Sequence, residues 1–277
     1  MILWLASYPK SGNTWVRYFL KSYFNSSDKN FSLDAKKNDD FSSTTFPNPI
    51  MLKEMNIDYF NFKNIIKNWV SMQDAINLNN KTNFLKTHNA MCTINSYPFT
   101  NTKNTLGGIY IVRDPRDIVA SFADHFQISH EEVVENMMSP QYGEFPEENG
   151  KNYYLTMFGT WSDHYNSWKS YNGRKIMIVK YEDLVSKTYK TFSNIIKYLE
   201  DINIITFDEK KIKFSIEETS FANLRKLEEK NGFIEKGKGS FFFRKGKVGS
   251  WKQELNKKLV KKIEQKFNKE MLELGYI

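Results

Sequence analysis

The sequence contains little cysteine and no long apolar run. Cys92 is the one cysteine among 277 residues, so no disulfide bond can form within the chain. No apolar run approaches the roughly 18 residues that a membrane-spanning helix requires. The first apolar run also has no basic leader and no cleavage site. We therefore expect a cytoplasmic protein without a membrane span.

Proline and glycine are also scarce, with 7 and 13 residues. No stretch rich in proline, serine or glycine divides the chain, and its length suffices for one large core. We therefore expect a single domain over residues 1–277. The balance of 40% hydrophobic and 26% charged residues is typical of globular proteins and excludes a disordered chain.

Acidic residues are outnumbered by basic ones, 32 to 40, which gives a formal net charge of +8. Such a charge suits anionic ligands, and it equally suits nucleic acid or a membrane surface. Only six of the basic residues are arginine, and three of these, Arg113, Arg116 and Arg244, lie in the later motifs described below. A non-enzymatic, basic nucleic-acid-binding protein is therefore one alternative.

The first twenty-four residues combine a strand, a polar loop and a helix. Residues 2–6 are a short apolar run typical of a buried strand, and apolar residues over 15–24 repeat at helical spacing. A loop that enters a helix presents unpaired backbone N–H groups and the positive end of the helix dipole. The intervening residues 7–14 are therefore predicted to bind an anion.

This loop departs from the nucleotide-binding pattern G-x-x-x-x-G-K-[ST]. Gly12 and Thr14 are in register, but Ser7 replaces the first glycine and Asn13 replaces the lysine. The lysine lies inside the loop, at Lys10, where it can reach a phosphate or a leaving-group oxygen. This argues against an ordinary ATPase or kinase. A strand-to-helix turn with an incidental lysine is the alternative.

The next part of the chain carries a candidate general base. Residues 25–82 are polar and rich in asparagine, with apolar patches typical of one or two helices, and form either an acceptor-side insertion or a purely structural one. Residues 83–87 are a predicted strand that ends at His88. A histidine at the carboxyl end of a strand can serve as general base, although a structural or surface histidine fits the same position.

A second strand, residues 107–112, leads into an arginine and a helix. Asp114 is expected to cap that helix, and Ser121 lies two turns further on. Arg113, at the strand end, can present a planar fork of donors to a phosphate. An ion pair with Asp114 or Asp117 is the alternative for this arginine.

The remaining segments predict further strands and helices. Residues 175–180 form a strand that ends at Tyr181, and strands separated by helical patterns predict a parallel sheet flanked by helices. The glycine- and lysine-rich residues 231–251 are either a mobile surface loop or a segment that orders when an anion binds. A last helix is expected over residues 255–274.

Taken together and in this order, these segments resemble the cytosolic-type sulfotransferase family, which uses 3′-phosphoadenosine 5′-phosphosulfate (PAPS) as sulfuryl donor. Residues 8–15, Tyr-Pro-Lys-Ser-Gly-Asn-Thr-Trp, are similar to the family's loop for the 5′-phosphosulfate. Arg113 with Ser121 matches its 3′-phosphate pair, and residues 244–252 match its C-terminal signature. Residues 85–88, 181–183 and 219–221 are shorter matches.

The resemblance implies a three-layer P-loop-like fold and transfer of a sulfuryl group to a hydroxyl, less often an amine, with release of adenosine 3′,5′-bisphosphate (PAP). It implies that His88 is the base, that Lys10 meets the leaving oxygen, and that no metal is required. The donor-binding residues that it implies are Lys10, Ser11, Gly12, Asn13, Thr14, Trp15, Arg113, Ser121, Tyr181, Thr219, Ser220, Phe221, Arg244, Lys245 and Gly246.

Departures from the family pattern limit what carries over. Asn13 stands where the family often has threonine, and it keeps a hydrogen-bonding side chain. Ser250 replaces a common aspartate and is expected still to cap the following helix. The family's short dimerisation motif has no clear match, so the oligomeric state does not carry over. An ATP-dependent P-loop phosphotransferase is a second alternative to this family.

Overall fold

The computed structural model describes residues 1–25, 31–33, 41, 45–58, 60–144, 156–239 and 241–277. The chain divides into two compact units. Unit 1 comprises Met1–Tyr8, Thr44–Tyr110 and Glu135–Ile178. Unit 2 comprises Pro9–Ser43, Ile111–Val134 and Val179–Ile277. The chain passes from one unit to the other at or near the carboxyl ends of three strands.

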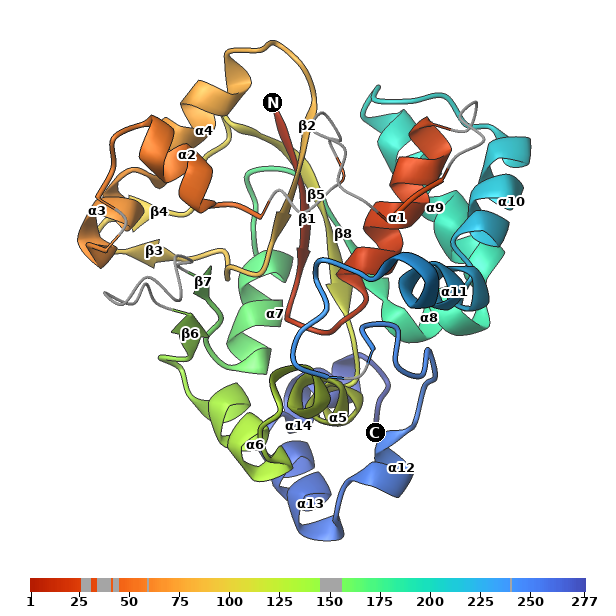
Figure 1. Ribbon diagram of the computed structural model, residues 1–277. Coiled ribbons are helices and arrows are strands. Elements are labelled where there is room, and N and C mark those ends of the chain that lie inside the picture. The colour runs from red at the N-terminus through yellow and green to blue at the C-terminus, as the bar shows by residue number, and fades with distance from the viewer. Residues whose placement is uncertain (26–30, 34–40, 42–44, 59, 145–155, 240) are drawn as a thin grey trace. The chain divides into compact units, whose positions relative to one another are not determined.

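The central sheet is parallel and has the strand order β2-β1-β5-β8 (Figure 1). Its strands are β1 (Ile2–Ser7), β2 (Asn83–Thr87), β5 (Thr105–Val112) and β8 (Ile176–Lys180). In register, Ile2 of β1 lies opposite Asn83 of β2, and Ala6 lies opposite Thr87. All six residues of β1 are buried, which is why the strand reads as a continuous apolar run. The predicted parallel sheet flanked by helices is confirmed.

Unit 1 is built around the inner strands and a group of aromatic side chains. The Trp4 ring packs on Phe99, with ring centroids 5.1 Å apart, and its indole N–H donates to Thr105 Oγ1 at 2.9 Å. Its helices include α2 (Pro49–Glu54), α3 (Phe62–Lys67), α4 (Trp69–Asn77) and α7 (Trp161–Lys169). The described part of residues 25–82 thus holds three helices after α1, where the sequence predicted one or two.

Two short hairpins and one connecting helix complete this part of the chain. The hairpins are β3 (Thr93–Ile94) with β4 (Tyr97–Pro98), and β6 (Gly143–Glu144) with β7 (Thr156–Met157). Strands of two residues are too short to leave a periodic pattern, so the sequence did not predict them. Helix α6 (His130–Met138) carries the chain from unit 2 back to unit 1.

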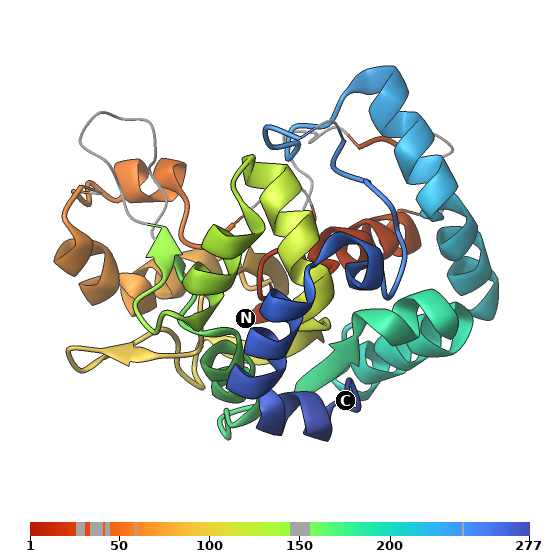
Figure 2. The ribbon, with the colours of Figure 1, turned by 90° about the horizontal axis from the view of Figure 1, so that it is seen from below.

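Unit 2 is mainly helical. Its helices are α1 (Asn13–Phe24), α5 (Pro115–Phe126), α8 (Tyr181–Ser186), α9 (Thr188–Asp201), α10 (Glu209–Glu218), α11 (Phe221–Asn231), α12 (Trp251–Glu254), α13 (Lys257–Lys266) and α14 (Asn268–Glu273). Helix α1 packs on α9 through stacked Phe19 and Phe192 rings, whose centroids are 3.9 Å apart. Figure 2 shows the blue C-terminal helices beside the yellow-green α5, which α12 and α13 contact.

The predicted last helix over residues 255–274 is wrong as a single element. It consists of α13 and α14, which are separated at Phe267. The backbone of Phe267 leaves the helical region, at φ −108° and ψ 21°, and its side chain is fully buried. Apolar spacing continues across the break because both helices bury residues on the same core, so the pattern alone cannot show the bend.

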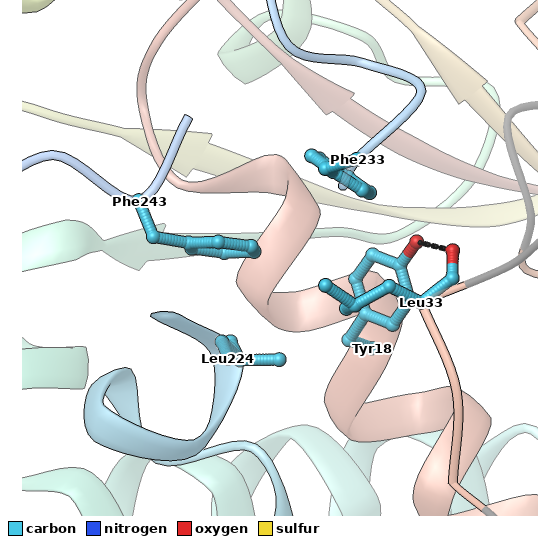
Figure 3. Packing of buried hydrophobic residues seen from close by; sticks show 5 residues of the cluster. All are labelled: Tyr18, Leu33, Leu224, Phe233 and Phe243. Atoms are coloured by element: carbon cyan, nitrogen blue, oxygen red, sulfur yellow. Dashed lines mark hydrogen bonds between the residues drawn. The ribbon is translucent and has the colours of Figure 1, made fainter. Parts of the chain in front are cut away.

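The glycine- and lysine-rich segment is packed on unit 2 where the structure describes it. Phe233 and Phe243 of this segment belong to a buried cluster with Tyr18, Leu33 and Leu224 (Figure 3). The Tyr18 hydroxyl donates to the Leu33 carbonyl at 2.9 Å, as the dashed line in Figure 3 marks. Burial of these two rings removes apolar area from water and anchors the segment, although Ile234 beside Phe233 is 76% exposed.

Candidate active site

The residues expected to bind the donor all lie in unit 2, although they come from five separate parts of the sequence. Arg113 follows β5 directly, Tyr181 follows β8 directly, and Lys10 lies three residues after the end of β1. This placement agrees with the rule that ligands of open α/β sheets bind beyond the carboxyl ends of the strands. His88 follows β2 and lies in unit 1.

The loop before α1 requires glycine at position 12. Gly12 has φ +101°, and a Cβ atom there would lie 2.6 Å from Cδ2 of Tyr181. Any other residue would combine an unfavourable backbone with a steric clash. Lys10 also has a left-handed backbone, with φ +64°, which costs on the order of 1 kcal/mol for a residue other than glycine. The loop therefore has a specific conformation that positions the first turn of α1.

Ser11 provides a buried hydroxyl at this helix terminus. Its side chain is 1% exposed, and Ser11 Oγ has no hydrogen-bond partner among the residues that the structure describes. A buried hydroxyl without a partner costs about 1–3 kcal/mol. Helix α1 has no acidic residue of its own in its first turn, and its N-terminus carries the positive end of the helix dipole. Ser11 and this helix end together favour an anionic ligand.

The neighbouring Asn13 and Thr14 side chains already bond to the protein. Arg17 Nε donates to Asn13 Oδ1 at 3.2 Å, and Arg17 Nη2 donates to Thr14 Oγ1 at 3.2 Å. Thr14 Oγ1 in turn donates to Glu235 Oε2 at 3.3 Å. The Glu235 carboxylate also pairs with Arg17, whose side chain is 1% exposed. An ion pair therefore links the first turns of α1 to residue 235.

Arg113 is held by main-chain carbonyl groups. Its Nη1 donates to the Lys10 carbonyl at 3.0 Å and its Nη2 to the Lys247 carbonyl at 3.4 Å, while its guanidinium lies 4.3 Å from the centre of the Tyr181 ring. Arg113 Nε is buried and has no partner in the described part of the chain. Burial raises the pKa of the Tyr181 hydroxyl, although Arg113 partly offsets this effect.

The alternative ion pair of Arg113 with Asp114 or Asp117 does not form, because both carboxylates bond elsewhere. Asp114 caps α5 as predicted, accepting from the Arg116 backbone N–H at 2.9 Å, and also pairs with the Arg116 side chain at 2.7 Å. Burial raises the pKa of the Asp114 carboxyl, and the bonds from Arg116 partly offset this. Asp117 accepts from two backbone N–H groups, those of Gly249 and Trp251.

The expectation that Ser250 caps the following helix, α12, is wrong. The Ser250 side chain makes no capping bond to α12. Asp117 on α5 instead accepts from the Gly249 N–H at 2.7 Å and from the Trp251 N–H at 2.9 Å, so a carboxylate distant in sequence satisfies these groups. Ser250 itself has helical backbone angles, φ −60° and ψ −27°, and an N-cap residue that bonds through its side chain normally has extended ones.

The two basic residues of the C-terminal signature share one carboxylate. Arg244 Nη1 donates to Glu254 Oε2 at 2.7 Å, and Lys245 Nζ donates to Glu254 Oε1 at 2.6 Å. Arg244 Nε is buried and has no partner within the described ranges. Gly246 follows with φ +60°, and a Cβ atom there would lie 2.3 Å from Cδ2 of Phe221. Gly246 thus allows the Phe221 ring to approach the main chain.

The remaining donor-site candidates are placed as follows. Thr219 Oγ1 donates to the Ser215 carbonyl at 2.6 Å, and Ser220 Oγ accepts from the Asn223 N–H at 3.4 Å, so both hydroxyl groups cap helices. Trp15 packs edge-on against Tyr181, with ring centroids 6.4 Å apart. Ser121 is half-buried on α5.

His88 is oriented by hydrogen bonds inside unit 1. Its Nδ1 lies 2.7 Å from the Ser7 carbonyl oxygen, which can only accept, so Nδ1 carries the proton and Nε2 is the basic nitrogen of the neutral ring. The His88 carbonyl lies 3.0 Å from Nε2 of His164, which is fully buried. His164 Nδ1 lies 2.8 Å from the Tyr110 hydroxyl. Burial lowers the pKa of His164 to about 4, so this ring is neutral at pH 7.

Sequence reasoning missed four residues that shape these arrangements: Arg17, Glu235, Glu254 and His164. Arg17 and Glu235 are 218 positions apart, and no local pattern connects them. His164 is 54 positions from Tyr110 and 76 from His88. Of these four, only Glu254 could have been noticed in the sequence, because it is the single acidic residue beside four basic residues in 244–254.

Two further searches cover the same described residues. No group of three or more histidine, cysteine, aspartate or glutamate side chains there is arranged to hold a metal ion. Among these residues no helix is both long enough and apolar enough to cross a membrane.

Comparison with known proteins decides the family. The model of the sulfotransferase domain family matches residues 2–275. The chain belongs to this family. Neither an ATP-dependent phosphotransferase nor a nucleic-acid-binding protein is favoured by this match, and the resemblance read from the sequence is confirmed.

Individual sulfotransferases are distant in sequence. Sulfotransferase 1 family member D1 of Mus musculus is 27% identical over 290 residues, covering 96% of this chain and 82% of the relative. Cytosolic sulfotransferase 1 of Danio rerio is 24% identical over 257 residues, covering 90% and 75%. A crystal structure of retinol dehydratase with androsterone and inactive cofactor PAP superposes with a TM-score of 0.60 at 18% identity, covering 98% and 80%. This structural likeness shows that the fold is shared.

Proposed function

We propose that the protein transfers a sulfuryl group from PAPS to a hydroxyl group, less often an amine, of a small-molecule acceptor. Membership of the sulfotransferase family supports the reaction class. The observation that carries the proposal is a set of buried donor groups without described partners in unit 2. These groups are Ser11 Oγ, Arg113 Nε and Arg244 Nε. Three separate unsatisfied donors on the expected anion-binding segments are explained together by a ligand with two phosphate groups.

Different residues of unit 2 are proposed to bind the 5′ end, the 3′-phosphate and the adenine of the donor. Lys10, Ser11, Gly12, Asn13 and Thr14 would hold the 5′ end at the positive terminus of α1. The Nε groups of Arg113 and Arg244, with Lys245, Gly246 and Ser121, would hold the 3′-phosphate. Aromatic residues Trp15, Tyr181 and Phe221, with Thr219 and Ser220, would flank the adenine. PAP in the retinol dehydratase structure supports this choice of nucleotide.

His88 and Lys10 carry the proposed chemistry. When bound, PAPS supplies the sulfuryl group as an electrophile. The acceptor oxygen forms a bond to sulfur while the bond from sulfur to the bridging phosphate oxygen breaks. His88 Nε2 takes the acceptor proton, because Nδ1–H is held by the Ser7 carbonyl. Lys10 places its positive charge near the departing oxygen, and with the arginines it supplies the charge that Mg²⁺ brings in ATP-dependent enzymes, so no metal is required.

The rest of the assignment follows from the same family. We propose that the whole chain acts as one sulfotransferase domain and that residues 25–82 contribute to acceptor binding. Androsterone in the retinol dehydratase structure supports a small-molecule acceptor. The description of the Danio rerio relative as cytosolic supports a cytoplasmic location.

Calorimetry tests the donor assignment directly. We expect PAP to bind without a metal and ATP with Mg²⁺ to bind far more weakly, because the proposed 3′-phosphate contacts have no counterpart in ATP. A matched titration with adenosine 5′-monophosphate measures the contribution of the 3′-phosphate. Preference for ATP with Mg²⁺ would contradict the proposal and support a phosphotransferase.

The acceptor can be found by labelling. The protein is incubated with radiolabelled PAPS and a metabolite extract, and the labelled products are separated and identified. We expect labelled sulfate esters that are absent when the protein is omitted. Absence of any labelled product, despite tight PAP binding, would count against the transferase assignment for the metabolites in that extract.

A further inference from the structure

Glu254 lies where the proposed function requires positive charge. Its two carboxylate oxygens are each bonded by one basic side chain, Arg244 at 2.7 Å and Lys245 at 2.6 Å. Burial opposes ionisation, but the bonds from Arg244 and Lys245 outweigh it and keep the pKa of the Glu254 carboxyl below its usual value. Glu254 is therefore charged at neutral pH. It neutralises one of the two positive charges that the 3′-phosphate would use.

The position of Glu254 is fixed by the elements around it. It is the last residue of α12, whose first residue, Trp251, donates its N–H to the buried Asp117 carboxylate. The Trp251 ring also lies under the Arg116 guanidinium, 4.0 Å from the ring centre. These contacts hold α12 against α5. The Glu254 side chain is 15% exposed, so little water screens its carboxylate from Arg244 and Lys245.

The Arg244 guanidinium can bind a second partner besides Glu254. Glu254 bonds to Nη1, whereas the buried Nε has no partner in the described chain. A phosphate bound at Nε would therefore meet an arginine that is already paired with a carboxylate. The negative charges of that phosphate and of the Glu254 carboxylate repel each other, and the low exposure of Glu254 limits the screening of this repulsion by water.

We propose that Glu254 is a specificity-determining counter-ion of the 3′-phosphate subsite, which weakens binding of 3′-phosphorylated nucleotides and so promotes release of the product PAP. The inference rests on the proposed function, because it requires the 3′-phosphate to bind Arg244 and Lys245. Product release limits turnover in many enzymes, so a carboxylate that prevents overly tight product binding has a direct benefit.

The test is calorimetric titration of the wild type and Glu254→Gln with PAP and with adenosine 5′-monophosphate. We expect Glu254→Gln to bind PAP about tenfold more tightly or better, since it removes the negative charge, and to bind the monophosphate within about twofold of the wild type. A purely structural role would change both affinities in the same direction. Unchanged or weaker PAP binding by Glu254→Gln would overturn the inference.

Two further variants make the result specific. Glu209→Gln removes an exposed carboxylate of unit 2 that pairs with Lys213 on α10, and it should leave both affinities unchanged. Glu254→Asp keeps the charge and should keep wild-type selectivity, whereas Glu254→Ala also removes the charge and should tighten PAP binding, so Glu254→Ala decides the matter if Glu254→Gln folds poorly. Failure of the wild type to prefer PAP over the monophosphate would instead contradict the proposed function.

Discussion

At the scale of single residues, the orientation of His88 is the feature with the clearest chemical meaning. A bond from Nδ1 to the Ser7 carbonyl selects the tautomer in which Nε2 can accept a proton. Ser7 lies three residues before Lys10 in the sequence, so one short segment orients the proposed base and also contains the proposed leaving-group cation.

Replacement of His88 by alanine should separate binding from chemistry. We expect PAP affinity to stay within about twofold of the wild type, because the proposed donor contacts lie in unit 2. Turnover should fall by about 10²- to 10⁴-fold, the usual effect of losing a general base. Steady-state rates with an acceptor found by labelling provide the measurement, and His130→Ala is the matched control. Normal turnover by His88→Ala would show that His88 is not the base.

His164 should make stability depend on pH. Its pKa is about 4 in the folded protein, because of burial, against 6.5 for an ordinary histidine. The unfolded chain therefore binds more protons between these values, and stability is lost as the pH falls from about 6.5 towards 4, by about 3 kcal/mol in total. This contribution is fully present above pH 6.5.

The effect of His164 can be isolated by comparing two proteins. Urea unfolding of the wild type and His164→Gln at several pH values between 4.5 and 7 gives the slope of the unfolding free energy for each. The wild-type free energy should rise more steeply with pH than that of the variant. Half-buried carboxyls whose pKa values are raised by desolvation, such as those of Glu144 and Glu182, act in the opposite direction in both proteins and cancel in the difference. Equal slopes would contradict the assignment.

At the scale of elements, the ion pair between Arg17 and Glu235 connects α1 to the segment that leads to Arg244. Arg17 is buried, and Glu235 is 12% exposed. Removing one partner of such a pair leaves a buried charge without compensation, which is strongly destabilising. This pair and the cluster of Phe233 and Phe243 together explain why the glycine-rich segment is packed.

Glu235→Gln should therefore lower the free energy of unfolding by about 3 kcal/mol. Urea denaturation at pH 7 measures the change. Glu209→Gln, which removes an exposed carboxylate, should leave it nearly unchanged, because water screens exposed ion pairs. A second variant that replaces Arg17 and Glu235 together with methionine and leucine should recover much of the loss, since no buried charge remains. A small effect of Glu235→Gln alone would show that the pair contributes little.

The sequence predicted the elements that local patterns define and missed what distant residues decide. Strands β1, β5 and β8 were recognised because buried parallel strands read as apolar runs, and β2 was recognised from the shorter apolar pair Phe84 and Leu85. The Asp114 cap follows from residues adjacent in sequence. The role of Asp117 at Gly249 and Trp251, by contrast, joins positions 132 and 134 apart. No local sequence pattern predicts contacts between residues this far apart, and the same holds for the contacts of Glu235 and His164.

At the scale of the whole molecule, the proposed donor-binding residues all lie in unit 2, and the proposed base, His88, lies in unit 1. PAP should therefore protect amides of unit 2 from hydrogen exchange more strongly than amides of unit 1. At a ligand concentration of 100 times Kd, the gain for amides that exchange by global unfolding is about 2.7 kcal/mol. Exchange followed by mass spectrometry should show the largest local protection in residues 9–14, 113–121 and 244–252. Protection confined to residues 45–58 and 83–88 would contradict this placement.

The same division has a consequence for how such sequences diverge. No proposed donor contact lies within Thr44–Tyr110 or Glu135–Ile178, the two long segments of unit 1. Selection for an unchanged nucleotide therefore does not act directly on the side chains of these segments, apart from those that fold the strands or orient His88. Mutations can accumulate there while the donor stays the same. Changes in these two segments can therefore leave the proposed donor contacts intact.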